Sequence, residues 1–251
     1  HLGSRVDFTT RDGSRERLAV RAMVSASAAT TVWEGPVGAG RQGSWLFAAR
    51  RSYIDWLLEK IDTTSGTAFG FTDAQAKLAL DLSPRQSLRI SMIGGQSVLR
   101  EKDDTPGPNT LERALNNSII ANVQWRFTPS ASFTTAQQVY VVNANYRNRV
   151  VDGRTREEGS DRDLTWRGSA SWNPRAGHLV EFGGQAQSLW ARRLDRRFTS
   201  TAEQLVVDAT GDAWSAAAWG TRWSGSARES GRATDADSPC RSRNPPRGSD
   251  T

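Results

Sequence analysis

The feature that most constrains the fold is an alternation of apolar and polar residues over stretches far longer than an ordinary strand. Between Ala68 and Leu82 the even-numbered positions are small or apolar for the most part, whereas Asp73, Lys77 and Asp81 occupy odd-numbered ones. Successive side chains of a strand point to opposite faces, so this pattern predicts a strand with one apolar face and one polar face. Similar alternation recurs further along the chain, over Leu88–Val98, Ser118–Phe127 and Asp163–Asn173, and more loosely over His178–Trp190 and Arg15–Ala28.

Prolines punctuate these strands at a nearly constant interval. Pro36, Pro84, Pro129 and Pro174 are each expected to mark a tight turn, because proline fixes φ and cannot donate to a strand ladder. Between successive proline turns there is room for two long strands and one longer polar loop, which we expect at residues 54–66, 100–116, 148–161 and 191–212. A β-propeller would need four short strands in each repeat. Short turns at one end and long loops at the other are typical of outer-membrane β-barrels.

The length of the strands also favours a membrane barrel. A tilted strand crosses a bilayer in roughly 9–11 residues, whereas strands of soluble proteins usually have five or six. The chain contains no apolar run long enough for a transmembrane helix. Tryptophan and phenylalanine near the proline turns predict an aromatic belt at the membrane interface, made of Trp33, Trp45, Trp125, Phe127 and Trp172.

The adjacent arginines Arg50 and Arg51 follow the apolar stretch that begins at Ser44. One of them must lie on the apolar side of the strand, because neighbouring residues face opposite ways. Arg50 has the polar parity. Arg51 has the apolar parity but lies about one bilayer crossing from Ser44, where arginine costs only about 0–1 kcal/mol and its long stem can reach the headgroups.

Composition excludes several other classes of function. The net charge is +6, but the 33 basic residues are interleaved with 27 acidic ones and never form a run longer than two, which disfavours a nucleic-acid partner. Cys240 is the only cysteine, and His1 and His178 are the only histidines. A clustered His/Cys metal site is therefore excluded, and nucleophilic catalysis with a histidine base would depend on His178. We expect neither an enzyme, nor a cofactor, nor a metal site.

The polar parity of the strands predicts which side chains line the interior of the barrel. These residues are Arg50, Asp73, Lys77, Asp81, Arg89, Gln124, Arg126, Arg167 and Glu181. They could line a solute path or hold a plug, but any wide barrel has a polar interior in which charges pair across strands. We therefore expect specific ligand contacts in the outer loops, with no individual residue assigned.

Two stretches resemble the barrel of TonB-dependent outer-membrane receptors. They are "EGPVGAGRQGSWLFAARRSYIDWLL" (34–58) and "FTDAQAKLALDLSPRQSLRISMIGG" (71–95), which are similar to the family's turn-and-strand sequences; the likeness extends less specifically to about Trp223. The resemblance implies outer-membrane lipid around the barrel, a plug domain and an inner-membrane energy-coupling complex in the full-length parent, and uptake of a scarce small ligand such as a siderophore, vitamin or glycan. The family has 22 strands, and about ten are expected here, so the chain is interpreted as a fragment.

Two other classes of barrel protein have to be weighed against a receptor. A generic outer-membrane barrel, such as a porin or an adhesin scaffold, fits the same pattern, and a plug domain upstream in the parent gene would separate it from a receptor. A barrel hydrolase using His178 is disfavoured by the position of that residue beside a turn.

Residues 1–223 are expected to form a partial, open, all-β antiparallel barrel of about ten strands. Residues 224–251 lack alternation and are expected to be a disordered or frameshifted tail.

Overall fold

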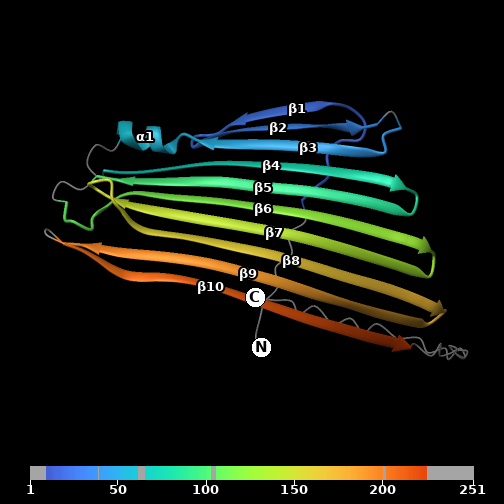
Figure 1. Cartoon of the computed structure of the whole chain (residues 1–251). Coiled ribbons are helices and arrows are strands. Elements are labelled where there is room, and N and C mark those ends of the chain that lie inside the picture. Colours follow the sequence, from blue (N-terminus) through green and yellow to red (C-terminus); the bar gives the residue numbers. More distant parts are fainter. Residues whose placement is uncertain (1–9, 39, 62–65, 103–105, 200–201, 225–251) are drawn as a thin grey trace, which may run out of the picture.

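The alternating segments pair with one another in chain order and form a single antiparallel sheet of ten strands (Figure 1). The computed structural model describes residues 10–38, 40–61, 66–102, 106–199 and 202–224. The strands are β1 (Ala19–Val24), β2 (Ala28–Val37), β3 (Gly43–Ser52), β4 (Thr67–Ser83), β5 (Gln86–Glu101), β6 (Leu111–Ser130), β7 (Phe133–Val150), β8 (Thr155–Arg175), β9 (His178–Phe198) and β10 (Glu203–Ser224), and the helix is α1 (Ile54–Ile61). The sheet is open, with β1 and β10 at its edges. The expected all-β, barrel-like architecture of about ten strands is thereby confirmed.

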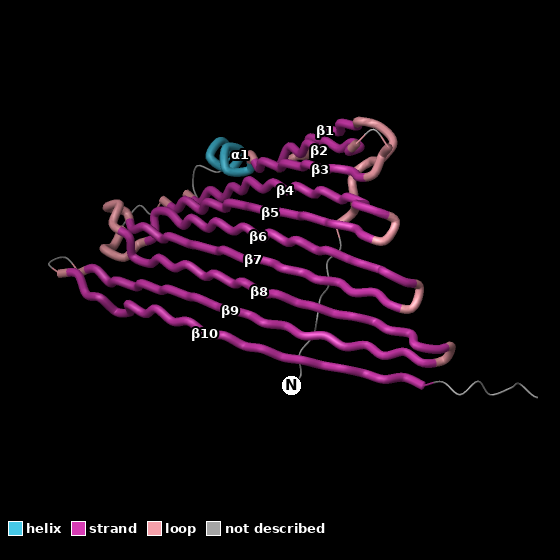
Figure 2. The backbone as a smooth tube through the Cα atoms, turned by 45° about the vertical axis from the view of Figure 1, so that its right-hand side comes forward, coloured by secondary structure: helices cyan, strands magenta, loops and turns pink. Residues whose placement is uncertain are grey.

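The connections divide between the two ends of the sheet as the proline spacing predicts. The turns after β2, β4, β6 and β8 lie at one end, and the longer connections after β3 and β5, together with α1, lie at the other (Figures 1 and 2). We call these the turn end and the loop end. None of the described helices is long and apolar enough to cross a membrane. The expected tail falls almost entirely on residues 225–251, which lie outside the described residues.

Three of the four prolines end a strand instead of occupying the turn itself. Pro84 is a turn residue, but Pro36, Pro129 and Pro174 are the penultimate residues of β2, β6 and β8. The ladder shifts its register between Phe127 and Ser130 on β6 and between Trp172 and Arg175 on β8. These irregularities surround the prolines because a residue without an N–H cannot maintain the ladder.

Several expected boundaries are wrong because strand pairing continues where alternation stops. The loops predicted at 148–161 and 191–212 are mostly strand: β8 begins at Thr155, and β9 and β10 extend to Phe198 and from Glu203. The loop predicted at 100–116 also narrows, since β6 starts at Leu111. The range Arg15–Ala28 is not one strand, because β1 covers only Ala19–Val24.

The register aligns residues that point to the same face of the sheet in rows that run from β2 to β10. One row consists of Gly35, Trp45, Leu78, Ile90, Val123, Val139, Trp166, Ala186 and Ala216. We call the face that carries this row the apolar face and the opposite one the polar face. Large side chains on the apolar face are uncovered by any other part of the described chain, as the 42% exposure of Val123 and the 52% exposure of Leu164 indicate. Within the described residues the sheet therefore has no second layer of the kind that encloses the core of a soluble β-sandwich.

A small cluster at the loop end ties the connection after β5 to the end of β9. The side chain of Asn109 donates to the carbonyl of Phe198 and accepts from its N–H, both at 2.8 Å. The backbone oxygen of Asn109 also accepts a hydrogen bond from Arg156 at 3.0 Å. The guanidinium of Arg154 lies 3.9 Å from the ring centroid of Phe198, which is almost fully buried. A single asparagine thus satisfies both backbone groups where β9 leaves the ladder.

We predict that Asn109→Ala will loosen this cluster, because it leaves the N–H and C=O of Phe198 without their side-chain partner. The expected local cost is about 1–3 kcal/mol. It should appear as faster hydrogen exchange of the Phe198 amide, measured on the chain refolded in detergent. Asn116→Ala is the matched control, because Asn116 is an exposed strand residue. Equal exchange rates in the two variants would contradict the role of Asn109.

The stability of the connection between β7 and β8 is expected to depend on pH through the carboxylate of Asp152. The pKa of Asp152 lies below its usual value, chiefly because its carboxylate accepts a hydrogen bond from the Arg154 side chain and also because it accepts one from the Arg154 backbone. A depressed carboxyl pKa stabilises the fold above the unfolded-state value of about 3.9, and the contribution is lost as pH falls through the folded-state value. Asp152→Asn should therefore open this connection at neutral pH. The difference from the wild type, measured by exchange at matched pH, should shrink as pH falls below about 4 and vanish below the folded-state pKa of Asp152.

Candidate functional site: the polar face and its N-terminal strap

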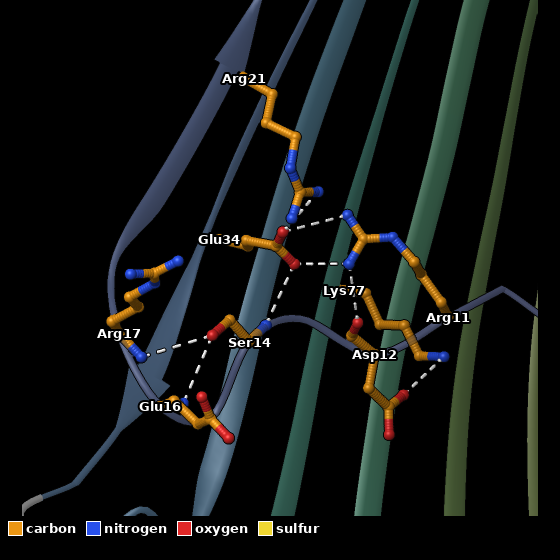
Figure 3. A network of polar contacts seen from close by, with 8 residues as sticks. All are labelled: Arg11, Asp12, Ser14, Glu16, Arg17, Arg21, Glu34 and Lys77. Carbon is orange, nitrogen blue, oxygen red and sulfur yellow. Dashed lines mark hydrogen bonds and ion pairs between the residues drawn. The ribbon is translucent and has the colours of Figure 1, made fainter.

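The chain before β1 crosses the polar face of the sheet instead of lying beside its edge. We call Thr10–Arg17 the strap (Figure 3). Asp12 forms an ion pair with Lys77 on β4 at 2.8 Å and a longer one with Arg89 on β5 at 3.8 Å. Arg15 pairs with Asp81 on β4 at 2.5 Å. Three of the residues predicted to line the interior, Lys77, Asp81 and Arg89, therefore hold the strap.

Glu34 on β2 is the most deeply buried charge of this network, with 1% of its surface exposed. Its carboxylate pairs with Arg11 of the strap at 2.5 Å and with Arg21 of β1 at 2.8 Å, and it accepts a hydrogen bond from the backbone N–H of Ser14 at 3.1 Å. A buried carboxylate requires such partners, because an unpaired charge is strongly destabilising away from water. Hydrogen bonding to Glu34 raises the pKa of Arg11, and hydrogen bonding to Asp81 raises that of Arg15.

The strap approaches the backbone of β3 closely at one glycine. A Cβ on Gly13 would lie 2.1 Å from the carbonyl oxygen of Trp45, so no side chain fits there. Leu46 and Ala79, which have the polar parity, are buried in this region. Beside them lies a cavity of about 210 Å³ lined in part by Thr10, Leu46 and Lys77. The strap therefore gives the polar face of β2–β5 a local core of its own.

Beyond the strap, toward the loop end, the polar face carries an open groove of about 360 Å³. Arg50 and Asp73 form one side of it, joined by an ion pair at 2.7 Å, and the guanidinium of Arg50 lies 4.7 Å from the ring centroid of Phe71. Tyr146 on β7 forms the opposite side, and the floor between them consists of small residues such as Gly95 and Ser118. The groove combines aromatic, charged and amide groups, and faces the same side as the strap.

The remaining predicted interior residues also have the polar parity but do not converge. Gln124 is in register with Arg89 and Gln138, and Arg167 with Gln138 and Gln185. Glu181 is in register with Ser171 on β8. Arg126 lines a broad groove of about 700 Å³ at the turn end. No ion pair or hydrogen bond of these four side chains is present within the described part of the chain. The sheet brings together Lys77, Asp81 and Arg89 at the strap and Arg50 and Asp73 at the groove.

The residues predicted for the aromatic belt all have the apolar parity and lie toward the turn end. Trp125 stacks on Phe127 with ring centroids 5.7 Å apart, and Trp33 and Trp172 are nearly half exposed. Other tryptophans were missed. Trp190 lies on the apolar face in register with Arg162, and Trp214 lies on the same face at the middle of β10, whereas Trp219 has the polar parity and lies against Gly183.

An apolar row on the polar face was not predicted from the sequence. Ile120 stands out there as an exception to the alternation of β6, and register places it in line with Ile93 on β5 and Val142 on β7. Ile93 and Ile120 are 42% and 45% exposed. The signal in the sequence was the apolar pair Ile119–Ile120, which breaks the alternation of its strand.

Neither chemistry nor similarity narrows the function further. Within the described ranges there is no group of three or more His, Cys, Asp or Glu side chains that could hold a metal ion. His178 begins β9 immediately after a turn, as expected. No protein-family model matches the chain, and no curated protein matches it.

We predict that Gly13→Ala will detach the strap, because the added methyl group would overlap the backbone of Trp45. Trypsin cleavage after Arg11 and Arg15 should accelerate about tenfold, the factor that corresponds to 1.4 kcal/mol, as measured by mass spectrometry of the released peptides. Gly211→Ala is the control, since a Cβ at Gly211 meets no atom within 4 Å. Unchanged cleavage in Gly13→Ala would mean that the strap is not anchored at this glycine.

Proposed function

We propose that the chain forms part of the barrel of a TonB-dependent outer-membrane receptor, embedded in outer-membrane lipid and serving energy-coupled uptake of a scarce ligand. The observation that carries the membrane part of this proposal is the height of the apolar band on the apolar face. On β6 the band consists of Ile119, Ala121, Val123, Trp125 and Phe127, and on β8 of Leu164, Trp166, Gly168, Ala170 and Trp172. Each set covers about nine residues of strand, which matches one tilted bilayer crossing.

The boundary of the band supports a tilted arrangement of the strands. Asn117 and Arg162 are the first polar residues of this face beyond the band on β6 and β8. One row across the sheet has Ala74, Gly94 and Ile119 on β4–β6 but Asn143, Arg162 and Asp212 on β7, β8 and β10, with Trp190 on β9 between the last two. The band is therefore inclined to the rows, as expected when strands of a barrel tilt by about 35–45° to the membrane normal.

The polar face favours a receptor over a generic barrel such as a porin or an adhesin scaffold. An aqueous pore needs a polar lining, whereas exposed Ile93 and Ile120 on this face would gain from being covered. The strap supports the same choice, because a segment preceding the first strand already lies against the polar face and is held by Lys77, Asp81 and Arg89. In a receptor of this family the plug domain and the inner-membrane energy-coupling complex would be the further partners. We propose no catalytic role and no nucleic-acid partner.

We predict that arginine on the two faces of β6 will have opposite consequences for insertion. Val123→Arg places a guanidinium in the middle of the apolar band and should cost about 2–4 kcal/mol when the chain folds into vesicles. Gln124→Arg, one residue away on the polar face, is the matched control and should cost almost nothing. The measurement is the urea dependence of folding into phosphatidylcholine vesicles. Equal effects of the two substitutions, or a monodisperse monomer in plain buffer, would refute a membrane barrel.

The receptor part of the proposal is tested in cells that make the parent protein. Uptake of its ligand should stop when the inner membrane is de-energised, although ligand still binds at the cell surface. Passage of solutes without energy would identify a porin instead. Reading the flanking DNA in all frames for a plug domain upstream and further strands downstream provides an independent check.

A further inference from the structure

Arginines of the apolar face lie at the loop-end boundary of the band on three strands. Arg51 and Arg162 are the first polar residues beyond the band on β3 and β8, and Arg192 follows Trp190 on this face of β9. The guanidinium of Arg162 lies 5.0 Å from the ring centroid of Trp190, its register partner. Arg192 is in register with Ser160, two residues from Arg162, so the two arginines are diagonal neighbours on one face.

No carboxylate of the described chain pairs with these three arginines. Arg51 donates a hydrogen bond to the hydroxyl of Thr72 at 2.8 Å. Asp212 is in register with Trp190 and thus lies diagonally from Arg192, yet no ion pair joins the two. The contrast with the polar face is clear at Arg50, which is adjacent in sequence to Arg51 and is paired with Asp73.

Further toward the loop end, the register sets arginines directly against one another. Arg113 on β6 is opposite Arg149 on β7. Like charges placed directly opposite destabilise a sheet unless an anion lies between them. Arg113 and Arg149 have no ion pair within the described residues. Arg147 is the exception on this side, since it pairs with Glu158 at 3.2 Å.

We propose that Arg51, Arg162 and Arg192, with Arg113 and Arg149 beyond them, bind the phosphate headgroups of anionic lipids in the outer leaflet. Guanidinium groups bind phosphate through two parallel hydrogen bonds and lose little solvation at a membrane interface. The proposal rests on the proposed membrane function, which makes the apolar face the lipid-facing one. The position of these arginines commits the site to lipid phosphate, because they follow directly on the band and share its face, and Trp190 has the place of an interfacial aromatic.

The test compares binding of the full chain to vesicles of phosphatidylcholine with and without phosphatidylglycerol, measured by flotation after refolding from detergent. The test variant is Arg162→Ala with Arg192→Ala. The matched control is Arg193→Ala with Arg197→Ala. It also removes two positive charges, but both are on β9 and both point to the polar face. The preference for anionic vesicles should fall roughly fivefold for each arginine removed in the test variant, and remain in the control. Heat-modifiable migration of each variant from phosphatidylcholine vesicles establishes that it has folded.

Each other outcome counts against the proposal. Equal losses in both variants would mean that net charge, not this site, attracts anionic lipid, and no loss in either would remove the site altogether. Inhibition of the preference by millimolar inorganic phosphate would assign the arginines to free phosphate. Wild-type chain that inserts into phosphatidylcholine but shows no preference would overturn only the lipid site. Failure to insert into any vesicle would overturn the membrane function together with it.

Discussion

The structure depends on one constraint: each strand must keep its parity in step with both neighbours across the whole sheet. Antiparallel pairing in chain order satisfies this constraint with connections between neighbouring strands only, so no crossover is required. A slip of one residue at any pair would exchange the two faces of every strand beyond it. The register shifts that do occur lie near the ends of strands, at Asp81–Ser83 and Phe127–Ser130 for example, where they leave the parity of the central rows intact.

This constraint explains which parts of the fold could be predicted from the sequence. In residues 68–82, 88–98 and 118–127 the alternation is strong, and the face of residues such as Leu78 and Arg89 follows directly from their parity. The pattern fails in residues 155–163 and 191–197, where both faces carry mostly polar residues although the strands remain paired. Beyond the apolar band neither face needs to be apolar, so the sequence loses its period while the backbone keeps its ladder.

The strap could not be predicted, because nothing local distinguishes it. Arg11, Asp12 and Arg15 look like an ordinary solvated charge pattern, and their partners Glu34, Lys77 and Asp81 lie 23 to 66 residues further along the chain. Complementary signs were visible in the sequence, but only the folded sheet brings them to one place. The interior residues Lys77, Asp81 and Arg89 were recognised by parity, and their use as a docking surface for the chain itself was not.

The two edges of the sheet differ greatly in length, and this difference limits how its backbone can be satisfied. β1 has six residues and β10 has 22. If these edges met to close a cylinder, a stretch of at least sixteen residues of β10 would still be unpaired, and every second residue of it would present free amide and carbonyl groups along that side. A lipid environment tolerates no such row, because hydrocarbon offers nothing to replace water as a partner. The free edge of β10 can therefore pair with another strand of comparable length. The register of the existing rows fixes how the residues of the two strands would align.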